Sequence, residues 1–499
     1  MSAVTAGRSH ADWTAFAQQV RFPDALVVDG ERVPPADGAS WAHVTPRDGS
    51  VLAATPAATE GDVDRAVDAA RRAFDDGPWP RMLPRERKDI LLRLVDLIEE
   101  NRAELALMIS LEMGKPISDA YAVELRAVLA TYRWYAEYAD KALDETSPVG
   151  PDDLALITRE PIGVVGVVTP WNFPLTLSAW KIAPALAAGC TVVHKPADLT
   201  PFSALRIAEL ALEAGVPPGV LNVVTGRGEI VGRHLGLSPD VDALAFTGST
   251  LVGRAFQRYA AESNLKRTWL ELGGKSPNIV LPDAPDLDAA LDVAAWGIFF
   301  NAGQMCTAPS RLIVHRAVAD EAIAGIIDRA GRYRPGDPLD PATTMGPLAS
   351  AARLSDVRRH VANAHEDGAT LLVGGPDLGG CFHPPTVFGD VDPTSRLARD
   401  EVFGPVLAVL VADDEEQAIA LANDSIYGLA AGLWTADLSR AHRLSRRLRA
   451  GTVWVNCYEE GDLTVPFGGF KQSGNGRDKS QHAVDKYTEL KTTYIKFRP

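Results

Sequence analysis

The sequence predicts an α/β protein built on doubly wound, mainly parallel sheets. From Ile162 onward, short strand-like apolar segments alternate with helix-length segments, and a second block with the same alternation begins near Pro277. The chain has 499 residues, of which 46% are apolar, so it can bury a large core and should divide into two or three domains.

The charge balance narrows the classes of partner. The chain carries 50 basic and 65 acidic residues, a net charge of −15, which argues against nucleic acid or an anionic membrane as the main partner. No apolar run approaches the length of a membrane span, and residues 1–18 lack the apolar core of a signal peptide. We therefore expect a cytoplasmic protein.

The four cysteines show no pairing pattern. Cys190, Cys306, Cys381 and Cys457 lie far apart, and the sequence contains no CxxC, no HExxH and no cluster of His and Cys. The sequence therefore predicts neither a metal site nor a disulfide framework, and a reducing compartment follows.

The first part of the chain is expected to supply helices and an arm. Residues 1–60 are predicted to wrap another domain as strands and turns, and Asp62 is placed to cap the helix that follows. Residues 145–161 have the pattern of an extended hairpin, a candidate oligomerisation arm, and 487–497 alternate like a strand that could pair with a partner subunit's hairpin. Helices are predicted over 62–74, from 84 to the residues before 114, and over 120–139.

The strands of the two blocks follow in order. They are predicted at 162–168, 191–195, 221–224, 243–247 and 268–271, and then at 278–281, 312–315, 406–411 and 452–456. Ligands of doubly wound sheets bind at the carboxyl ends of the strands, and the unusual residues of this chain follow those ends.

Cys306 is the strongest candidate for a chemical role. For an isolated cysteine the plainer interpretation is a buried, inert thiol. Upstream, however, Glu271 stands at an apolar strand end and is followed by two glycines. A partly buried glutamate binds protons more tightly than usual, which suits it to act as the base that a thiolate nucleophile needs.

Other strand ends carry groups with two possible uses. Asn172 can donate to a developing oxyanion, or it can satisfy a turn before a helix. Lys195 and Asp198 can grip ribose hydroxyls, or they can form a solvated salt bridge. The glycines of 246–253 allow a phosphate to approach a helix N-terminus, although this GxxxxG spacing alone is weak evidence, and Gly226 and Gly228 are expected to form turns.

Taken together, the motifs resemble those of the NAD(P)-dependent aldehyde dehydrogenases over almost the whole chain. Within that family, residues 461–479 look most like the bacterial gamma-glutamyl-gamma-aminobutyraldehyde dehydrogenases of putrescine breakdown. The seven matching motifs are Pro170–Pro174, Lys195-Pro196, Phe246–Gly253, Leu270–Gly274, the Cys306 loop, Glu401–Pro405 and Pro466–Lys471.

The resemblance implies an aldehyde dehydrogenase-like α/β fold with three parts. A Rossmann-type NAD-binding domain would comprise 1–141 and 162–273, a catalytic domain 274–475, and a β oligomerisation arm 142–161 and 485–499. The arm would support a dimer or a tetramer.

The resemblance also implies roles residue by residue. Cys306 would be the nucleophile and Glu271 the general base. Asn172 and the Cys306 backbone N–H would form the oxyanion hole, and Lys181 with Asp478 would correspond to a proton-relay pair. The implied cofactor-binding residues are Thr169, Pro170, Trp171, Lys195, Asp198, Gly228, Phe246, Gly248, Ser249, Gly253, Leu272, Glu401 and Phe403. Among these, Lys195 and Glu401 would hold the riboses, Ser249 the pyrophosphate, and Phe403 would pack beside the nicotinamide.

The chain departs from the family pattern at three positions. Asp198 and Asp478 each replace a more frequent Glu, and Leu348 stands where many relatives have a ribose-binding Gln. A carboxylate at 198 still repels a 2′-phosphate, so the resemblance implies NAD in preference to NADP.

The substrate is the least constrained part of the resemblance. It places Phe173, Leu177, Trp180, Phe300, Met305, Thr307 and Phe467 along an aldehyde tunnel. In the adjoining acidic loop, Glu459 and Asp462 either face solvent or attract the amino group of an omega-aminoaldehyde or its gamma-glutamyl derivative.

The implied activity is oxidation of an aldehyde to the free carboxylic acid through a thiohemiacetal and a thioester on Cys306. Hydrolysis is favoured over transfer to coenzyme A because the base is present. The alternatives are a broad-specificity aliphatic or aromatic aldehyde dehydrogenase, a cysteine hydrolase or esterase without redox chemistry, and a non-catalytic scaffold on this fold.

Overall fold

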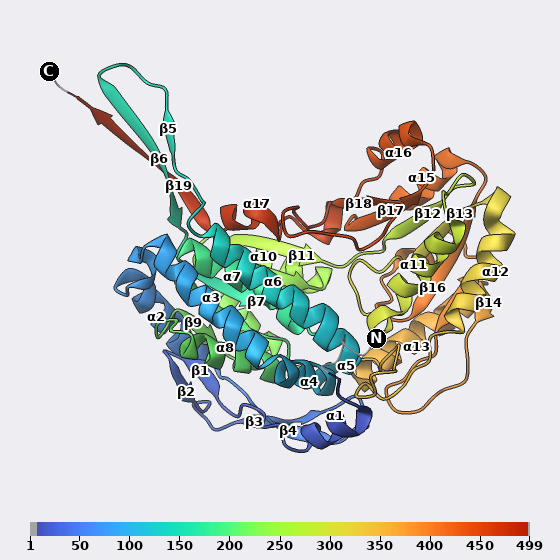
Figure 1. Cartoon of the computed structure of the whole chain (residues 1–499), viewed down its shortest axis with the longest axis horizontal. Helices are drawn as coiled ribbons and strands as arrows, with labels where there is room; N and C mark the ends of the chain where they lie inside the picture. Colours follow the sequence, from blue (N-terminus) through green and yellow to red (C-terminus); the bar gives the residue numbers. More distant parts are fainter. Residues whose placement is uncertain (1–6, 498–499) are drawn as a thin grey trace.

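A computed structural model of the chain, which describes residues 7–497, shows two lobes and a projecting arm (Figure 1). Each lobe is organised around a seven-stranded sheet, and a small two-stranded sheet lies at the base of the first lobe. Within residues 7–497, no helix has the length and apolar content needed to cross a membrane. The first six and the last two residues of the predicted domain ranges lie outside the described residues.

The first sheet has the strand order β11-β10-β7-β8-β9-β1-β2. The five strands expected from the sequence are confirmed and are parallel. At the edge, β1 is antiparallel to β9 and β2 is antiparallel to β1; strands were expected within residues 1–60, but not that two of them join this sheet. The strands are β1 (Leu26–Val28), β2 (Glu31–Val33), β7 (Val164–Val168), β8 (Thr191–Lys195), β9 (Leu221–Val223), β10 (Ala243–Gly248) and β11 (Arg267–Leu272). The small sheet pairs β3 (Ser40–Val44) with β4 (Val51–Pro56).

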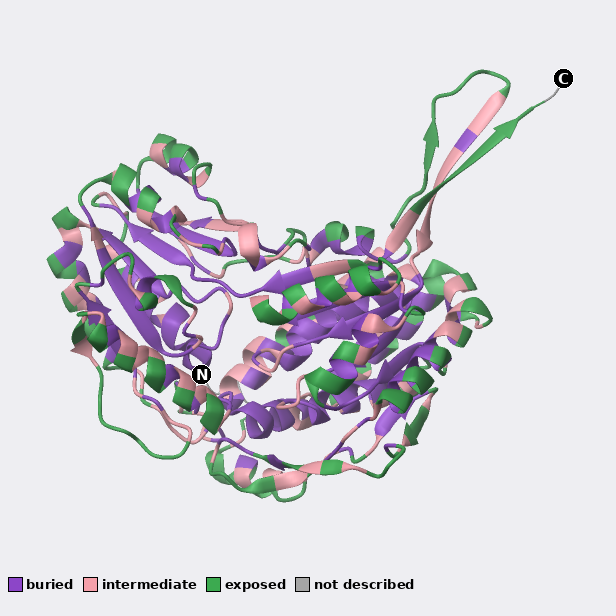
Figure 2. Cartoon of the chain, turned by 180° about the vertical axis from the view of Figure 1, so that it is seen from behind, coloured by how far each residue is buried: buried purple, intermediate pink, exposed green. Residues whose placement is uncertain are grey.

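Helices cover both faces of the first sheet, whose central strands are almost completely buried (Figure 2). They are α1 (His10–Ala17), α2 (Glu60–Asp75), α3 (Pro84–Glu100), α4 (Arg102–Met113), α5 (Ile117–Asp119), α6 (Leu125–Tyr138), α7 (Pro174–Ala188), α8 (Phe202–Glu213), α9 (Arg233–Leu237), α10 (Thr250–Glu262) and α17 (Ser480–Asp485).

Two helix boundaries differ from the sequence prediction, and each difference has a local cause. Thr59, not Asp62, caps α2: its hydroxyl accepts the Asp62 N–H at 3.2 Å, and the Asp62 carboxylate accepts the Thr59 N–H at 2.8 Å, which forms a capping box. The predicted run from 84 to 113 is broken at Asn101, whose side-chain amide donates to the Leu97 carbonyl at 2.8 Å and so competes with the helix backbone.

The second sheet has the order β14-β15-β16-β13-β12-β17-β18 and is parallel except at β14. The sequence did not predict β14, β15 and β17. The strands are β12 (Pro277–Val280), β13 (Arg311–His315), β14 (Thr370–Val373), β15 (Thr386–Gly389), β16 (Val406–Ala412), β17 (Ala430–Trp434) and β18 (Thr452–Val455). The helices of this lobe are α11 (Leu287–Phe299), α12 (Ala319–Ala330), α13 (Ala351–Glu366), α14 (Arg396–Arg399), α15 (Glu415–Asn423) and α16 (Leu438–Ser445). The two sheets span residues on either side of 273, and the division into domains stays a prediction.

The arm is a three-stranded sheet that projects away from both lobes (Figures 1 and 2). It contains β5 (Glu145–Ser147), β6 (Asp153–Pro161) and β19 (Thr488–Lys496). The strand β19 pairs along its whole length with β6 of the same chain, from Thr488 opposite Pro161 to Lys496 opposite Asp153. The C-terminal strand therefore meets its own hairpin, which differs from the expected pairing with a partner subunit.

Candidate active site

A cavity of about 310 Å³ opens at the carboxyl ends of β7, β10 and β11, where segments of the second lobe close over them. Eleven of the site residues expected from the sequence line it: Pro170, Trp171, Asn172, Leu177, Gly248, Ser249, Glu271, Leu272, Cys306, Glu401 and Phe403. Three lining residues were not singled out from the sequence, namely Thr247, Gly273 and Arg353.

Glu271, the penultimate residue of β11, is an isolated buried acid. Its side chain is only 3% exposed, and neither carboxylate oxygen has a hydrogen-bond partner among the described residues. Burial raises the pKa of Glu271 to about 8, although the positive charge of Lys181 acts in the opposite direction. The carboxyl group is therefore mostly protonated at neutral pH and becomes a base as the pH rises past 8.

Cys306 lies beside this acid on the wall of the same cavity. Burial, followed by the negative charges of Glu271 and Glu459, raises the pKa of the thiol well above its ordinary value. The Glu271 carboxyl and the thiol affect each other's pKa but are not joined by a hydrogen bond of standard geometry. At rest the sulfur keeps its proton and lies beside a carboxyl group that becomes a base when it ionises.

Two consecutive glycines allow the segment after Glu271 to approach both lobes. A side chain on Gly273 would collide with the Glu401 carboxylate, and one on Gly274 would collide with the carbonyl oxygen of Cys306. The Gly274 N–H donates to Oε1 of Glu401 at 2.9 Å, and burial raises the pKa of Glu401 to about 7. The glycines are thus needed for the contact between the two halves of the site.

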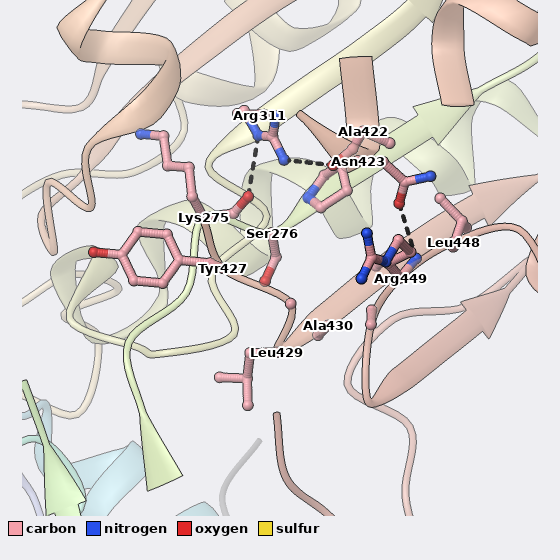
Figure 3. A pocket seen from close by; sticks show the side chains of 14 residues that line it. Lys275, Ser276, Arg311, Ala422, Asn423, Tyr427, Leu429, Ala430, Leu448 and Arg449 are labelled. Atoms are coloured by element: carbon pink, nitrogen blue, oxygen red, sulfur yellow. Dashed lines mark hydrogen bonds between the residues drawn. The ribbon is translucent and has the colours of Figure 1, made fainter. Parts of the chain in front are cut away.

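Beyond these glycines, the chain is anchored by Arg311 (Figure 3). The guanidinium donates to the Lys275 carbonyl at 3.0 Å and to the Ala422 carbonyl at 2.9 Å. The pocket beside it, lined also by Ser276, has a volume of about 10 Å³, which is room for about one water molecule. The hydrogen bond from Arg311 thus holds the chain at Lys275, just ahead of β12.

The loop that carries Cys306 has an unusual backbone. Asn301, Ala302 and Gly303, in the short helix η4 (Phe300–Gly303), all have φ between 50° and 71°, in the left-handed region. That conformation costs an alanine about 1–2 kcal/mol, so surrounding contacts must enforce it. One of them is the Asn301 side-chain amide, which donates to the Asn172 carbonyl at 3.1 Å.

Asn172 is held from both sides. Its side-chain nitrogen donates to the Gln304 carbonyl at 3.0 Å, and its own carbonyl accepts a hydrogen bond from Lys115 Nζ at 2.8 Å. Lys115 forms a buried ion pair with Glu124, which also accepts the backbone N–H of Leu175 at 3.0 Å in the first turn of α7. The amide of Asn172 is thereby fixed at the cavity wall, next to the cysteine loop.

Lys181 and Asp478 do meet in the structure, together with a third residue that the sequence did not reveal. Asp478 accepts hydrogen bonds from Lys181 at 2.8 Å and from Lys486 at 2.5 Å. Burial acts to raise the pKa of Asp478, but the two ammonium groups outweigh it and lower the value to about 2. Since Lys181 and Asp478 both shift the pKa of Glu271, the three groups are electrostatically coupled.

Several residues expected to bind the cofactor do not line the cavity. Lys195 Nζ donates to Asp198 and to the Pro196 carbonyl, both at 2.7 Å. Gly253 packs closely against Leu272. The others that lie outside the cavity wall are Thr169, which is hydrogen-bonded to His194 at 2.9 Å, Phe246, which is packed in the core, and Gly228, which is exposed.

Arg353 supplies a positive charge to the cavity that no sequence pattern indicated. Leu348 is buried in the core of the second lobe and offers no polar group, whereas Arg353, in α13, reaches the cavity. Its guanidinium donates to the Val402 carbonyl at 3.0 Å and lies 5.9 Å from the centre of the Phe403 ring. The Phe403 ring in turn meets Trp171 edge-on at 5.5 Å.

The residues expected to form the substrate tunnel are brought together as aromatic pairs. The Phe173 and Phe300 rings stack with their centres 6.2 Å apart, and the Trp180 and Phe467 ring centres are 5.2 Å apart. The other buried members of this set are Leu177, Met305 and Thr307.

The two acids of the loop that adjoins the substrate tunnel, Glu459 and Asp462, differ in their surroundings. Glu459 is partly buried, with Oε1 enclosed and without a hydrogen-bond partner among the described residues. Asp462 is exposed, and its carboxylate accepts the Thr464 N–H at 2.8 Å. Only Glu459 offers an enclosed oxygen with unused hydrogen-bonding capacity.

Comparison with known proteins places this geometry in a family. The model of the aldehyde dehydrogenase family matches residues 33–493. An aminoacetaldehyde dehydrogenase from Pseudomonas aeruginosa is 50% identical over 488 residues, which is 98% of either chain. A solved gamma-glutamyl-gamma-aminobutyraldehyde dehydrogenase from Burkholderia cenocepacia is 50% identical with a TM-score of 0.97, covering 98% of this chain and 100% of that chain.

A third relative was solved with ligands bound. It is an indole-3-acetaldehyde dehydrogenase mutant from P. syringae in complex with NAD+ and IAA, 49% identical with a TM-score of 0.97, and the match covers 98% of this chain and 100% of that chain. The chain therefore belongs to the aldehyde dehydrogenase family and is an oxidoreductase that acts on aldehydes.

Proposed function

We propose that the protein oxidises an aldehyde to the carboxylic acid with NAD, through a thiohemiacetal and then a thioester on Cys306. The observation that carries the proposal is the shared cavity, in which the Cys306 sulfur, the Glu271 carboxyl and the Asn172 amide converge at the ends of the parallel strands. A scaffold needs none of these three groups, and a hydrolase without redox chemistry does not account for the buried polar atoms Thr247 Oγ1 and Arg353 Nε beside them, which have no partner within residues 7–497.

The first step forms the bond between sulfur and carbon. The Cys306 thiol gives its proton to the unpaired Glu271 carboxylate, and the thiolate attacks the aldehyde carbon. The carbonyl oxygen then becomes an oxyanion. Asn172 has two N–H groups on its side-chain nitrogen, and because Gln304 accepts only one, the other remains for the oxyanion together with the Cys306 N–H.

The cavity fits a nicotinamide cofactor. Thr247 Oγ1 and Arg353 Nε are buried polar atoms without partners among the described residues, as expected where a polar ligand binds. NAD, when bound, accepts the hydride from the carbon that carries the sulfur. Glu401 and Lys195 would hold the riboses, and the Asp198 carboxylate beside Lys195 disfavours a 2′-phosphate.

The second step releases the acid. Loss of hydride leaves a thioester on Cys306, which needs water as the nucleophile. Glu271 in its carboxylate form takes a proton from that water, the new oxygen–carbon bond forms, and the carbon–sulfur bond breaks to return the cysteine. The Lys181–Asp478 pair would carry the proton away from Glu271.

The substrate that the site favours carries an amino group at its far end. Supporting this are the unpartnered Glu459 oxygen near the sulfur and the amino-bearing substrates named for the Pseudomonas and Burkholderia relatives. The aromatic walls Trp180 and Phe467, with the indole-3-acetaldehyde relative, support an aromatic aldehyde as the second candidate.

The proposal extends to the location and assembly of the protein. The reducing interior of a cytoplasm suits the unpaired cysteines, and the exposed strands of the arm suit a dimer or tetramer.

The direct test is a spectroscopic assay. We expect the reduced-nicotinamide absorbance to rise when 3-aminopropanal is added with NAD, and to rise more slowly with NADP. Absence of any absorbance change with 3-aminopropanal, butanal and indole-3-acetaldehyde would refute redox chemistry, and ester cleavage without nucleotide would then favour the hydrolase.

Glu459→Gln tests the recognition of the amine. We expect kcat/KM for 3-aminopropanal to fall about 10-fold, since a charge-assisted hydrogen bond is lost, while the value for butanal of equal length stays within about twofold. Asp462→Asn is the matched control and should change neither value by more than about twofold. An equal loss for both aldehydes in Glu459→Gln would contradict the role.

A further inference from the structure

A lysine lies beside two of the aromatic residues that are expected to line the substrate tunnel. Lys479, next to Asp478, places its ammonium 4.8 Å from the centre of the Trp180 ring and 5.5 Å from that of Phe467. Among residues 7–497 this ammonium forms no ion pair and no hydrogen bond, although the negative charges of Glu459, Asp478 and Asp462 act on it. Its backbone φ of 60° lies in the left-handed region, where the surrounding fold must hold a lysine in place.

Glu459 lies within electrostatic reach of both the sulfur and this lysine. Burial raises the pKa of Glu459, and the positive charge of Lys479 acts in the opposite direction; the negative charge of Glu459 in turn adds to the burial that raises the pKa of Cys306. The two side chains nevertheless do not form an ion pair, and Glu459 Oε1 stays enclosed without a partner. Glu459 therefore offers an unused acceptor and Lys479 an unused cationic donor, within electrostatic reach of each other.

A substrate with a single charge satisfies only half of this arrangement. A lone ammonium is attracted by Glu459 but repelled by Lys479. A lone carboxylate is attracted by Lys479 but repelled by Glu459. A group that carries both charges on neighbouring atoms pairs with both residues. The α-amino acid end of a γ-glutamyl amide is such a group.

We propose that Lys479 binds the carboxylate of a zwitterionic α-amino acid group at the far end of the aldehyde, while Glu459 accepts its ammonium. The inference rests on the proposed aldehyde oxidation and deepens it, because it makes Lys479 a residue that determines specificity. The Trp180 and Phe467 rings supply an apolar wall for the linker between the two ends of the substrate.

Four aldehydes with the same backbone separate the charges. They are 4-(γ-glutamylamino)butanal, with both charges, 4-(glutarylamino)butanal, with the carboxylate alone, 4-(4-aminobutanoylamino)butanal, with the ammonium alone, and 4-(butanoylamino)butanal, with neither. Steady-state kcat and KM are measured with NAD for the wild type, Lys479→Met, Lys479→Gln, Lys479→Arg and, as a matched control, Lys496→Met in the exposed part of β19.

For Lys479→Met and Lys479→Gln we expect kcat/KM to fall about 10- to 30-fold for the two aldehydes that carry a carboxylate, mainly through KM. The ammonium-only aldehyde should be unchanged or improved, and the uncharged aldehyde should stay within about twofold, which also shows that the variants fold. Lys479→Arg should keep most of the wild-type selectivity, and Lys496→Met should resemble the wild type.

An equal loss for all four aldehydes, or no loss for the carboxylate-bearing pair, would overturn the inference. These outcomes are distinct from failure of the proposed function. If the proposed function were wrong, the wild type would oxidise none of the four aldehydes, the uncharged one included, and the inference would be refuted together with the activity.

Discussion

Replacing Cys306 with alanine is expected to abolish aldehyde oxidation. Without the sulfur there is no thiohemiacetal, so kcat should fall by about 10⁴-fold or more, as is typical when a covalent nucleophile is removed. The NAD dissociation constant should stay within about threefold, because the cavity also has walls from β7, β10 and the Glu401 segment. Stopped-flow absorbance and a fluorescence titration with NAD measure the two quantities.

Cys381→Ala serves as the matched control. That cysteine lies ahead of β15, outside the cavity, and its thiol is partly exposed. Its loss should leave both quantities unchanged. Turnover that persists in Cys306→Ala and is lost in Cys381→Ala would refute the assignment of the nucleophile.

Glu271→Gln is expected to separate the two halves of the reaction. The amide can take a proton neither from the thiol nor from water, so both steps should slow. Deacylation should slow most, by about 10²- to 10⁴-fold, because a thiol ionises far more readily than water, and a thioester should accumulate. The expected record is a burst of about one reduced nicotinamide per subunit, slower than in the wild type, followed by a still slower steady rate, with the acyl group visible by mass spectrometry of the intact protein. Glu100→Gln, an exposed change at the end of α3, should behave as the wild type.

The pH dependence follows from the raised pKa of Glu271. With a value of about 8, the carboxylate form increases as the pH rises through 8, so the wild-type deacylation rate should increase between about pH 7 and pH 9. The Gln variant has no such ionisation, and its residual deacylation rate should be flat across that range. A flat wild-type profile would mean that another group is the base.

The sequence allowed much of the site to be predicted because strand ends in a parallel sheet share one edge. Asn172, Glu271 and Cys306 each follow a strand or helix end that could be found from local patterns, and the structure brings all three to one cavity. Arg353 could not be found this way. It lies within an ordinary helix, α13, and reaches the cavity only because of how the second lobe packs.

The same limit applies to the fold. Alternating side chains identified 487–497 as a strand, but alternation describes the faces of a strand and not its neighbour, so pairing with β6 of the same chain was not distinguishable from pairing with another subunit. The short strands β14 and β17 were missed for a related reason: β14 is half-exposed and β17 is a five-residue apolar run, and neither has the pattern of a half-buried strand.

The proton that Cys306 retains at rest also protects the protein chemically. Peroxides and alkylating agents react with thiolates far faster than with thiols, so a partly buried, protonated sulfur beside carboxylates is a poor target for them. The nucleophile is thus exposed to irreversible damage only during the short interval in which the sulfur is a thiolate. A catalytic sulfur arranged in this way tolerates an oxidising environment better than one activated permanently by a neighbouring cation.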